Sequence, residues 1–395
     1  MDALDDFYAI AQGLRKNVED YELRKEKGLS PYDAVLHELQ RPYGDMTNYE
    51  KVISVMEKCF SADAARAWFA YSDYTVSAQP RSVEDAANAM DDDIKARAGQ
   101  LTEELCRAGM LVKKQNPDGK EGYLRNYLFG ILNRANYYPD EDPFAEVGAE
   151  WWMSLVNGGS RTLRSGRTPY RIIPHEGVLD GDSVHGRIPM GIEIPDQRQV
   201  LPMDRLDQIL DSRYKIATMD CICRRMQERN GTKKCDHPVE DVCLTFNQMA
   251  EATIEQGFAK EITAEKAKDI VRQCRDRGLV QEISDAVNPL ALCNCCECCC
   301  LCLISMNRFE ETIASPSRWQ ADAAHTEKCV GCGKCAGLCP AHAIDFSDGA
   351  PFIDAGRCIG CGECAALCPE GVIRMKKRAG APDSCAVDTP GRVYI

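Results

Sequence analysis

Apolar residues recur with helical spacing in the first third of the chain. After Tyr49 they stand three or four positions apart, at Val52, Val55, Met56, Cys59 and Phe60. A break at residues 61–63 precedes a second short helix that carries Trp68 and Phe69. Such spacing predicts amphipathic helices that pack on a shared core. The highly charged segment before them, residues 1–45, is predicted to form an exposed helical arm.

A third group of helices and a hairpin follow. Ser82 and Asp85 form a helix start that is similar to a capping box. A longer helix then carries one apolar face, made of Ile94, Ala98, Leu101 and Leu105, and Gly109 stands where a C-terminal cap belongs. Residues 111–112 and 123–129 predict two strands around a turn at 116–119. This order of helices and hairpin over residues 46–130 resembles the winged-helix fold.

The charge of this segment argues against DNA binding. DNA-binding winged helices present basic or amide side chains on the helix that enters the major groove. The corresponding segment here contains fewer basic than acidic residues. The basic residues are Lys95, Arg97 and Arg107, and the acidic residues are Asp91, Asp92, Asp93, Glu103 and Glu104. The whole chain has 48 basic and 61 acidic residues, a formal net charge of −13. Nucleic acid is therefore a disfavoured partner, and a docking or structural module is favoured.

The remaining segments complete an α+β multidomain architecture. Residues 131–215 are rich in Pro and Gly and contain short β-like runs at 170–173 and 188–194, so they predict a β-containing connector. Residues 216–315 form a cysteine-rich module, 320–380 a compact C-terminal domain and 381–395 a tail.

The cysteines change this picture most. The 395 residues include 23 cysteines, yet Cys59 and Cys106 are the two that precede residue 220. The chain starts with an acidic stretch and has no apolar leader, and no apolar run approaches the roughly 18–20 residues that span a bilayer. We therefore expect a cytoplasmic protein without a membrane span. In that reducing compartment, dense cysteines indicate bound metal rather than disulfides.

An internal repeat carries the clearest chemical signal. Cys329-x2-Cys332-x2-Cys335-x3-Cys339-Pro returns 29 residues later as Cys358-x2-Cys361-x2-Cys364-x3-Cys368-Pro. Structural zinc sites use separated CxxC pairs, which this run of four does not match. The repeat resembles the bacterial-type 2[4Fe-4S] ferredoxins, whose domain is a (βαβ)2 fold.

That resemblance implies a ligand set for each of two [4Fe-4S] clusters. In such ferredoxins the fourth cysteine of each motif ligates the cluster of the other motif. One cluster is then held by Cys329, Cys332, Cys335 and Cys368, and the second by Cys358, Cys361, Cys364 and Cys339.

The cysteine-rich module supplies further candidate ligands. These are Cys221, Cys223, Cys235, Cys243, Cys293, Cys295, Cys296, Cys298 and Cys299, and Cys300 and Cys302 bring the number of clustered thiols to eleven, with His237 beside them. Cys274 lies on an apolar helical face and is predicted to be an inert core residue. Adjacent cysteines point in different directions, which favours two neighbouring centres with interleaved ligands, or one centre with spare thiols.

Three cofactor contents stay open for this module. Two further [4Fe-4S] clusters are favoured over one, and both over zinc or a non-cubane cluster. The whole chain is thus predicted to hold three or four [4Fe-4S] clusters.

The order of motifs resembles large 4Fe-4S ferredoxin-like proteins of anaerobic bacteria and archaea. The resemblance implies an electron-transfer protein or subunit, more a non-catalytic component than an enzyme. Its expected partner is an oxidoreductase, a flavoprotein or metalloenzyme, because thiolate-ligated clusters would give a negative surface that suits electrostatic docking. Two alternatives remain: a reductase whose cysteine-rich module is itself catalytic, and a redox-sensing winged-helix regulator.

Overall fold

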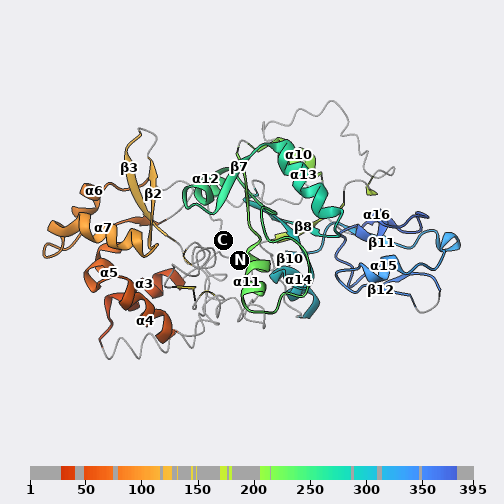
Figure 1. The fold of residues 1–395 in the computed structure, drawn as a ribbon, viewed down its shortest axis with the longest axis horizontal. Helices are drawn as coiled ribbons and strands as arrows, with labels where there is room; N and C mark the ends of the chain where they lie inside the picture. Colours follow the sequence, from red (N-terminus) through yellow and green to blue (C-terminus); the bar gives the residue numbers. More distant parts are fainter. Residues whose placement is uncertain are drawn as a thin grey trace. The chain divides into compact units, whose positions relative to one another are not determined.

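The chain folds into two compact units (Figure 1). The computed structural model describes residues 28–40, 49–73, 79–115, 119–126, 131, 144–145, 148, 170–175, 178–179, 205–213, 215–285, 289–308, 314–346 and 349–379. The first unit contains the chain up to Gly159 together with Glu255–Phe258. The second unit contains Ser160–Ile254 and Ala259–Pro390.

Helices and one small sheet build the first unit. Its helices are α3 (Pro31–Gln40), α4 (Tyr49–Cys59), α5 (Ala62–Trp68), α6 (Val83–Ala87), the 3-10 turn η1 (Lys95–Arg97) and α7 (Ala98–Arg107). Its strands β1 (Ser72–Asp73), β2 (Leu111–Gln115) and β3 (Glu121–Arg125) lie in the order β1-β3-β2. The antiparallel β2–β3 hairpin and the helices before it agree with the elements predicted from the sequence.

Capping residues lie at the ends of these helices. Ser61 caps α5 by accepting a hydrogen bond from the Ala64 N–H, and Ser82 caps α6 by accepting one from the Asp85 N–H. Gly109 follows α7 with a φ of 72°, a left-handed conformation that glycine adopts without strain. The predicted start at Ser82 and stop at Gly109 are confirmed, whereas α5 begins at Ala62, within the break expected at residues 61–63.

Part of the expected exposed arm is a core helix. In α3 one face is buried and packs with Trp68 and Phe60 in the core of the first unit, through Tyr32, Val35, Leu36 and Leu39. These positions have the spacing of a helical face, so α3 is buried because of its apolar residues although its neighbours are charged. Residues 1–27 and 41–48 lie outside the described part of the chain.

A seven-stranded sheet organises the second unit. Its order is β10-β4-β8-β9-β6-β5-β7, and each neighbouring pair is antiparallel except β10–β4. The strands are β4 (Tyr170–Ile173), β5 (Ile216–Met219), β6 (Cys243–Phe246), β7 (Ala259–Ile262), β8 (Val280–Ser284), β9 (Ala291–Cys295) and β10 (Ala314–Ser315). The accompanying helices are α10 (Leu206–Asp211), α11 (Ile222–Arg229), α12 (Asn247–Glu255), α13 (Ala264–Arg275) and α14 (Leu301–Arg308). Of the two β-like runs in the predicted connector, 170–173 is β4, and 188–194 lies outside the described residues.

The C-terminal elements repeat the spacing of the cysteine motifs. They are β11 (Trp319–Asp322), the 3-10 turn η4 (Thr326–Lys328), α15 (Lys334–Gly337), β12 (Ile344–Asp345), β13 (Phe352–Ile353), α16 (Glu363–Ala366) and β14 (Arg374–Lys377). The strands β11 and β14 pair antiparallel, as do β12 and β13. The short helices α15 and α16 begin 29 residues apart, which is the offset of the sequence repeat.

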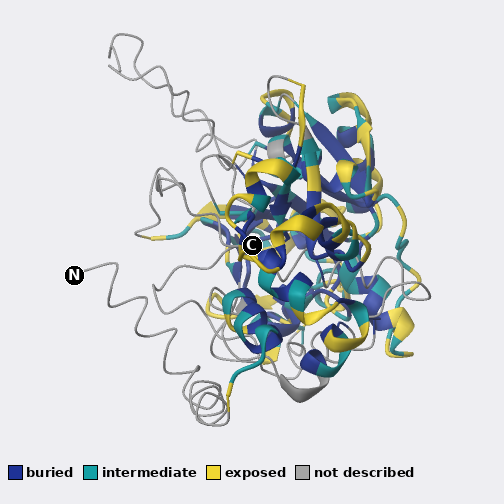
Figure 2. Ribbon diagram, turned by 90° about the vertical axis from the view of Figure 1, so that its left-hand side faces the viewer, coloured by how far each residue is buried: buried dark blue, intermediate teal, exposed yellow. Residues whose placement is uncertain are grey.

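One apolar core joins these C-terminal elements to the seven-stranded sheet. Ile172, Val280 and Leu303 share it with Trp319 and Ile373. The sheet and the C-terminal elements therefore share one set of buried residues. Figure 2 colours the buried residues of the chain dark blue. Within the described ranges, no helix is both long and apolar enough to cross a membrane.

Candidate metal centres

Strand β9 and the turn after it supply most of the clustered thiols. Cys293 and Cys295 lie on one face of β9, because alternate residues of a strand point the same way. Asn294 points to the other face, where its amide donates to the Val242 carbonyl at 2.7 Å. The chain then turns sharply, with the Cys300 N–H donating to the Cys296 carbonyl at 3.0 Å. This turn separates neighbouring cysteines into two groups.

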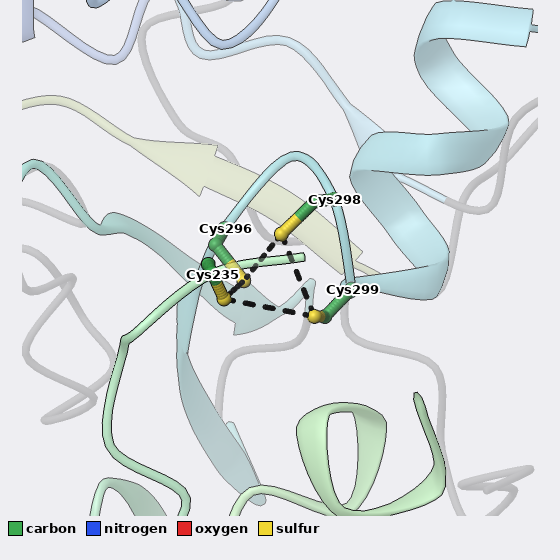
Figure 3. Close-up of side chains that lie close together, drawn as sticks. All are labelled: Cys235, Cys296, Cys298 and Cys299. Carbon is green, nitrogen blue, oxygen red and sulfur yellow. Dashed lines mark hydrogen bonds between the residues drawn. The ribbon is translucent and has the colours of Figure 1, made fainter. Parts of the chain in front are cut away.

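The first group, here called the four-thiol group, contains Cys235, Cys296, Cys298 and Cys299 (Figure 3). The Cys235 sulfur lies 3.8 Å from those of Cys296 and Cys299. The Cys298 sulfur lies 3.8 Å from that of Cys296 and 3.5 Å from that of Cys299. All four sulfurs lie within 4.8 Å of one another, so they converge on one point.

The second group, here called the seven-thiol group, is more deeply buried. Its members are Cys221, Cys223, Cys243, Cys293, Cys295, Cys300 and Cys302. Six of them follow one another as neighbours around a closed ring, in the order Cys221, Cys223, Cys300, Cys295, Cys293, Cys243 and back to Cys221. Cys302 adjoins the ring beside Cys300. The eleven clustered thiols therefore divide into four and seven.

A buried glutamate belongs to the seven-thiol group. Both carboxylate oxygens of Glu282 on β8 lie 3.7 Å from the Cys300 sulfur, and the side chain is 1% exposed. Burial and then the neighbouring thiolates of Cys300 and Cys293 raise the pKa of Glu282 well above its ordinary value. A protonated carboxylic acid in this place can donate a hydrogen bond to a thiolate.

A buried arginine lies between the two groups. Arg224 is 0% exposed, and its Nε donates to the Cys296 sulfur at 3.4 Å. Its other nitrogens donate to the carbonyls of Pro238 at 2.8 Å and Asn294 at 2.5 Å. Burial acts to lower the pKa of Arg224, but the thiolates of Cys221 and Cys296 raise it overall. The guanidinium thus offsets negative charge in both groups.

The acidities of neighbouring thiols depend on one another in both groups. Hydrogen bonds from Cys298 and Cys299 lower the pKa of Cys296 to about 2, and those from Cys243 and Cys295 lower the pKa of Cys293 to about 6. The thiolate is the form of cysteine that ligates metal. The same hydrogen bonds raise the pKa of the neighbouring thiols, that of Cys298 to about 12 and that of Cys295 well above its ordinary value, so one thiol in each close set ionises before the others.

The repeated cysteines form two further assemblies in the C-terminal elements. Cys329, Cys332, Cys335 and Cys368 line one pocket, together with Phe346 and Ile373. Cys364 has Cys358 and Cys339 as charged neighbours, and Cys361 has Cys364 and Cys339. In each assembly the fourth cysteine of one motif lies beside cysteines of the other motif.

Backbone amides in this domain point at the sulfurs. The N–H groups of Ala343 and Val372 each donate at 3.3 Å, to Cys339 and Cys368 respectively, and the Ala321 N–H donates to Cys358 at 3.5 Å. Such bonds stabilise thiolates and tune the potential of a bound iron–sulfur cluster. The first two bonds occur at equivalent positions of the repeat, 29 residues apart.

The two assemblies differ in burial. Cys332 is exposed, and Cys329, Cys335 and Cys368 are half-buried. Cys358, Cys361 and Cys364 are buried. We call the first the outer assembly and the second, completed by Cys339, the inner assembly.

Strand β4 joins the inner assembly to the seven-thiol group. At its start, Tyr170 has Cys293 and Cys302 as electrostatic neighbours. Just after its end, the His175 N–H donates to the Cys361 carbonyl at 2.8 Å. Four residues, 171–174, thus separate Tyr170 beside the seven-thiol group from His175 beside the inner assembly.

The structure also locates residues outside the predicted ligand set. Arg224, Glu282 and Tyr170 were not predicted as parts of the site, although Arg224 directly follows the Cys221-x-Cys223 motif. His237 is an electrostatic neighbour of Cys296 and lies outside the four-thiol group. Cys274 is buried on the apolar face of α13, as predicted, and burial raises the pKa of its thiol to about 11.

Comparison with known proteins identifies one segment. Residues 328–372 match the family model described as a 4Fe-4S dicluster domain. Neither the curated proteins nor the solved structures include a match to the chain. Residues 328–372 begin directly before Cys329 and end after Cys368, so they contain all eight repeated cysteines. The chain therefore carries a 4Fe-4S dicluster domain. This domain and the further cysteine groups indicate an iron–sulfur electron-transfer role.

Proposed function

We propose that this protein is an electron-transfer protein or subunit that passes electrons along a row of iron–sulfur centres to or from a partner oxidoreductase. The observation that carries the proposal is the sequence of assemblies in one apolar core: outer, inner and, beyond β4, the seven-thiol group. When bound, each cluster supplies one-electron redox chemistry. The residues of the chain hold the centres, exclude water and keep them near one another.

Two [4Fe-4S] clusters belong to the dicluster domain. We assign Cys329, Cys332, Cys335 and Cys368 to the outer cluster and Cys358, Cys361, Cys364 and Cys339 to the inner cluster. The pocket lined by the outer four cysteines and the neighbours of Cys361 and Cys364 support this assignment. The amide donors to Cys339, Cys358 and Cys368 further support it, because such donors accompany cluster thiolates.

The seven-thiol group is proposed to hold a third iron–sulfur centre. Four thiolates complete one cubane, so this group has donors enough for one and three to spare. Its members are buried or half-buried, which gives the dry environment that a redox centre needs. The hydrogen bond from His175, just after β4, to Cys361 supports electron exchange between this centre and the inner cluster. So does the electrostatic interaction of Tyr170, at the start of β4, with Cys293 and Cys302.

The exposed surface of the dicluster domain is proposed as the docking face for the partner. Of the five large apolar side chains that are exposed in the described ranges, four lie in this domain: Val330, Leu338, Phe352 and Leu367. Val330 directly follows the cluster cysteine Cys329 and is 65% exposed. Apolar contacts around an accessible cluster, with negative charge from the cluster thiolates, suit a partner face that is apolar at its centre and basic at its rim.

Iron and acid-labile sulfide per chain, measured after anaerobic purification, test the electron-transfer proposal. Three clusters require about twelve irons, and the dicluster domain alone about eight. Cys361→Ala should remove about four irons, and Cys59→Ala in the first unit, the matched control, should remove none. Fewer than about eight irons in the unaltered chain would refute the proposal.

A reductase centred on the seven-thiol group is the second candidate. Three thiols in excess of one cubane, with Glu282 against Cys300, favour it because they could assist chemistry on a substrate. EPR spectra of the reduced protein with candidate substrates test this function. Spectra that do not change with any of these substrates would contradict the reductase function and leave electron transfer as the supported function.

A further inference from the structure

We propose that the four-thiol group holds a single Zn²⁺ ion, as a closed structural site separate from the iron–sulfur centres. The ligands are Cys235, Cys296, Cys298 and Cys299. The inference rests on the spacing of their sulfurs, on the contrast with the dicluster domain and on the chain that surrounds them.

The sulfur spacing fits one tetrahedral ion. Four of the six sulfur–sulfur separations are 3.5–3.8 Å, and all six are within 4.8 Å. The centre of a regular tetrahedron with edges of that length lies about 2.1–2.3 Å from each corner, which matches a zinc–thiolate bond of about 2.3 Å. Four thiolates in a tetrahedron are the usual structural zinc site.

The same spacing argues against a cubane. A [4Fe-4S] cluster places four irons and four sulfides between its thiolates, so the ligand sulfurs stand apart around a cavity. The dicluster domain of this chain has that arrangement: Cys329, Cys332, Cys335 and Cys368 line a pocket. Among the described residues, no three of its eight cysteines come within 4.8 Å of one another. The four-thiol group has instead closed to contact distance.

The surrounding chain gives the site its ligands and part of its charge balance. Three ligands come from the tight turn after β9, and Cys235 comes from the loop between α11 and β6. Four thiolates around Zn²⁺ carry two net negative charges. The buried Arg224 guanidinium, 3.4 Å from the Cys296 sulfur, offsets one of them.

A zinc ion here would fasten the loop that carries Cys235 to the turn that carries the other ligands. Cys295, the last residue of β9, and Cys300 of the seven-thiol group lie on either side of these ligands, so zinc would fix one wall of the neighbouring redox centre. Zinc suits this task because it has no redox chemistry of its own. It would also use four of the eleven clustered thiols and leave seven for a single further centre.

Metal analysis and zinc X-ray absorption on the full chain, purified anaerobically, test the proposal directly. We expect about one zinc per chain with four sulfur neighbours at about 2.3 Å. Absence of zinc, zinc with nitrogen or oxygen neighbours, or a mononuclear iron in its place would overturn the proposal. This measurement needs no variant, so it decides even if a ligand substitution prevents folding.

A pair of variants then assigns the ligands. Cys298→Ala should lower zinc from about one to near zero per chain and leave iron and labile sulfide unchanged. Cys332→Ala, the matched control in the outer assembly, should lower iron by up to about four and leave zinc unchanged. Loss of about four irons with Cys298→Ala would identify a cubane in the four-thiol group. Because iron and zinc are counted separately, the zinc site can fail while the electron-transfer proposal stands, and the reverse.

Discussion

Arg224 shows how a single residue can hold the cysteine-rich module together. Its three hydrogen bonds go to a thiolate on the turn after β9, to a carbonyl on β9 and to the loop that carries Cys235. The guanidinium is planar and presents its donors in a fixed fork, which a lysine cannot reproduce. Its burial makes each lost bond costly, because the partner left behind stays out of water.

Arg224→Ala should therefore destabilise the second unit by about 3–5 kcal/mol, the cost of breaking a buried charged pair. Arg224→Lys keeps the charge but loses the fork, so it should lower the stability of the second unit by less than Arg224→Ala does. Anaerobic thermal unfolding, with zinc and iron measured on the same samples, is the readout. Equal unfolding temperatures for Arg224→Ala and the unaltered protein would contradict this account.

The two glycines at equivalent positions of the cysteine repeat, Gly331 and Gly360, differ in their surroundings. Both have left-handed φ angles, 70° and 73°. A Cβ at Gly331 would meet nothing within 4 Å, whereas one at Gly360 would collide with the Trp319 carbonyl and the Ser317 hydroxyl. The inner assembly is packed against β11, and its glycine is needed for space as well as for backbone conformation.

This difference predicts unequal effects of one substitution. Gly331→Ala should cost about 1 kcal/mol from backbone strain alone, and Gly360→Ala about 3 kcal/mol because overpacking is added. We expect Gly360→Ala to lose about four irons per chain on purification and Gly331→Ala to retain its iron. Similar iron losses in both variants would show that the contact with β11 is unimportant.

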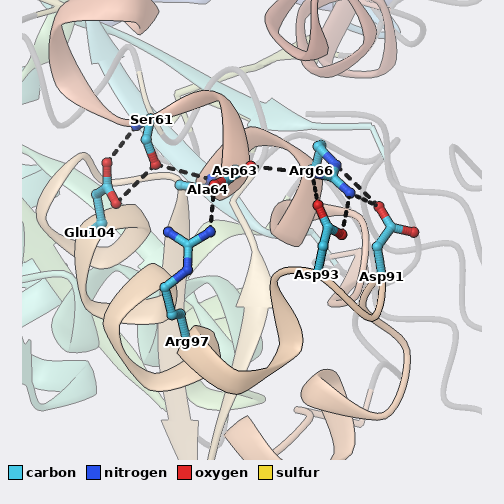
Figure 4. Close-up of polar contacts among 8 residues, drawn as sticks. All are labelled: Ser61, Asp63, Ala64, Arg66, Asp91, Asp93, Arg97 and Glu104. Atoms are coloured by element: carbon cyan, nitrogen blue, oxygen red, sulfur yellow. Dashed lines mark hydrogen bonds and ion pairs between the residues drawn. The ribbon is translucent and has the colours of Figure 1, made fainter.

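At the scale of elements, polar contacts connect the short helices of the first unit (Figure 4). The Ser61 hydroxyl caps α5 and also donates to the Glu104 carboxylate of α7 at 3.2 Å. Arg66 of α5 pairs with Asp91 and Asp93 at 2.6 and 2.8 Å, and Arg97 pairs with Asp63 at 2.5 Å. Hydrogen bonds to Asp93 and Asp91 raise the pKa of Arg66. Paired in this way, these arginines are poorly placed to bind phosphates.

Ser61→Ala should remove the cap of α5 and the hydroxyl's hydrogen bond to Glu104 of α7, whereas the bond from the residue 61 N–H to the same carboxylate stays. The expected loss is about 1 kcal/mol, the usual value of an N-cap. In a unit of this size that loss lowers the unfolding temperature by about 2–4 °C. Ser82→Ala, which removes the cap of the neighbouring helix α6, tests whether the Glu104 contact adds to the effect of the cap. A loss for Ser61→Ala no larger than that for Ser82→Ala would argue that the hydroxyl's bond to Glu104 contributes nothing.

The sequence predicts these elements well where the signal is local. The Ser82 cap, the Gly109 stop, the hairpin and the apolar face of α13 are all encoded within a few residues of themselves. The dicluster repeat is likewise local, because its spacing alone limits which metals it can bind. Strand β1 was missed because two residues are too short to show a period.

The division of the eleven thiols depends on contacts between distant segments. Cys243 meets Cys293 because β6 pairs with β9, with Leu244 opposite Leu292, and a sequence pattern does not specify that register. The sequence does indicate that neighbouring cysteines diverge, and Cys295 and Cys296 do enter different groups. The three-dimensional structure was needed to show which distant thiols lie beside each of them.

At the scale of the whole molecule, each unit has its own apolar core. Trp68, Leu36 and Leu101 are among the buried residues of the first core. The second core contains Ile172 and Trp319 together with cysteines of the seven-thiol group and the inner assembly, such as Cys295 and Cys361. Metal binding should therefore contribute to the folding of the second unit and leave that of the first unaffected.

Removal of the metals tests this separation. In anaerobic calorimetry we expect two unfolding transitions, one for each core. Oxidative removal of the clusters with a chelator present should lower or abolish one transition, because thiolates that lose their metal become buried charges without compensation. The other transition should keep its temperature, and Ser61→Ala should shift that transition alone. A single transition that moves as a whole in both experiments would mean that the two cores unfold together.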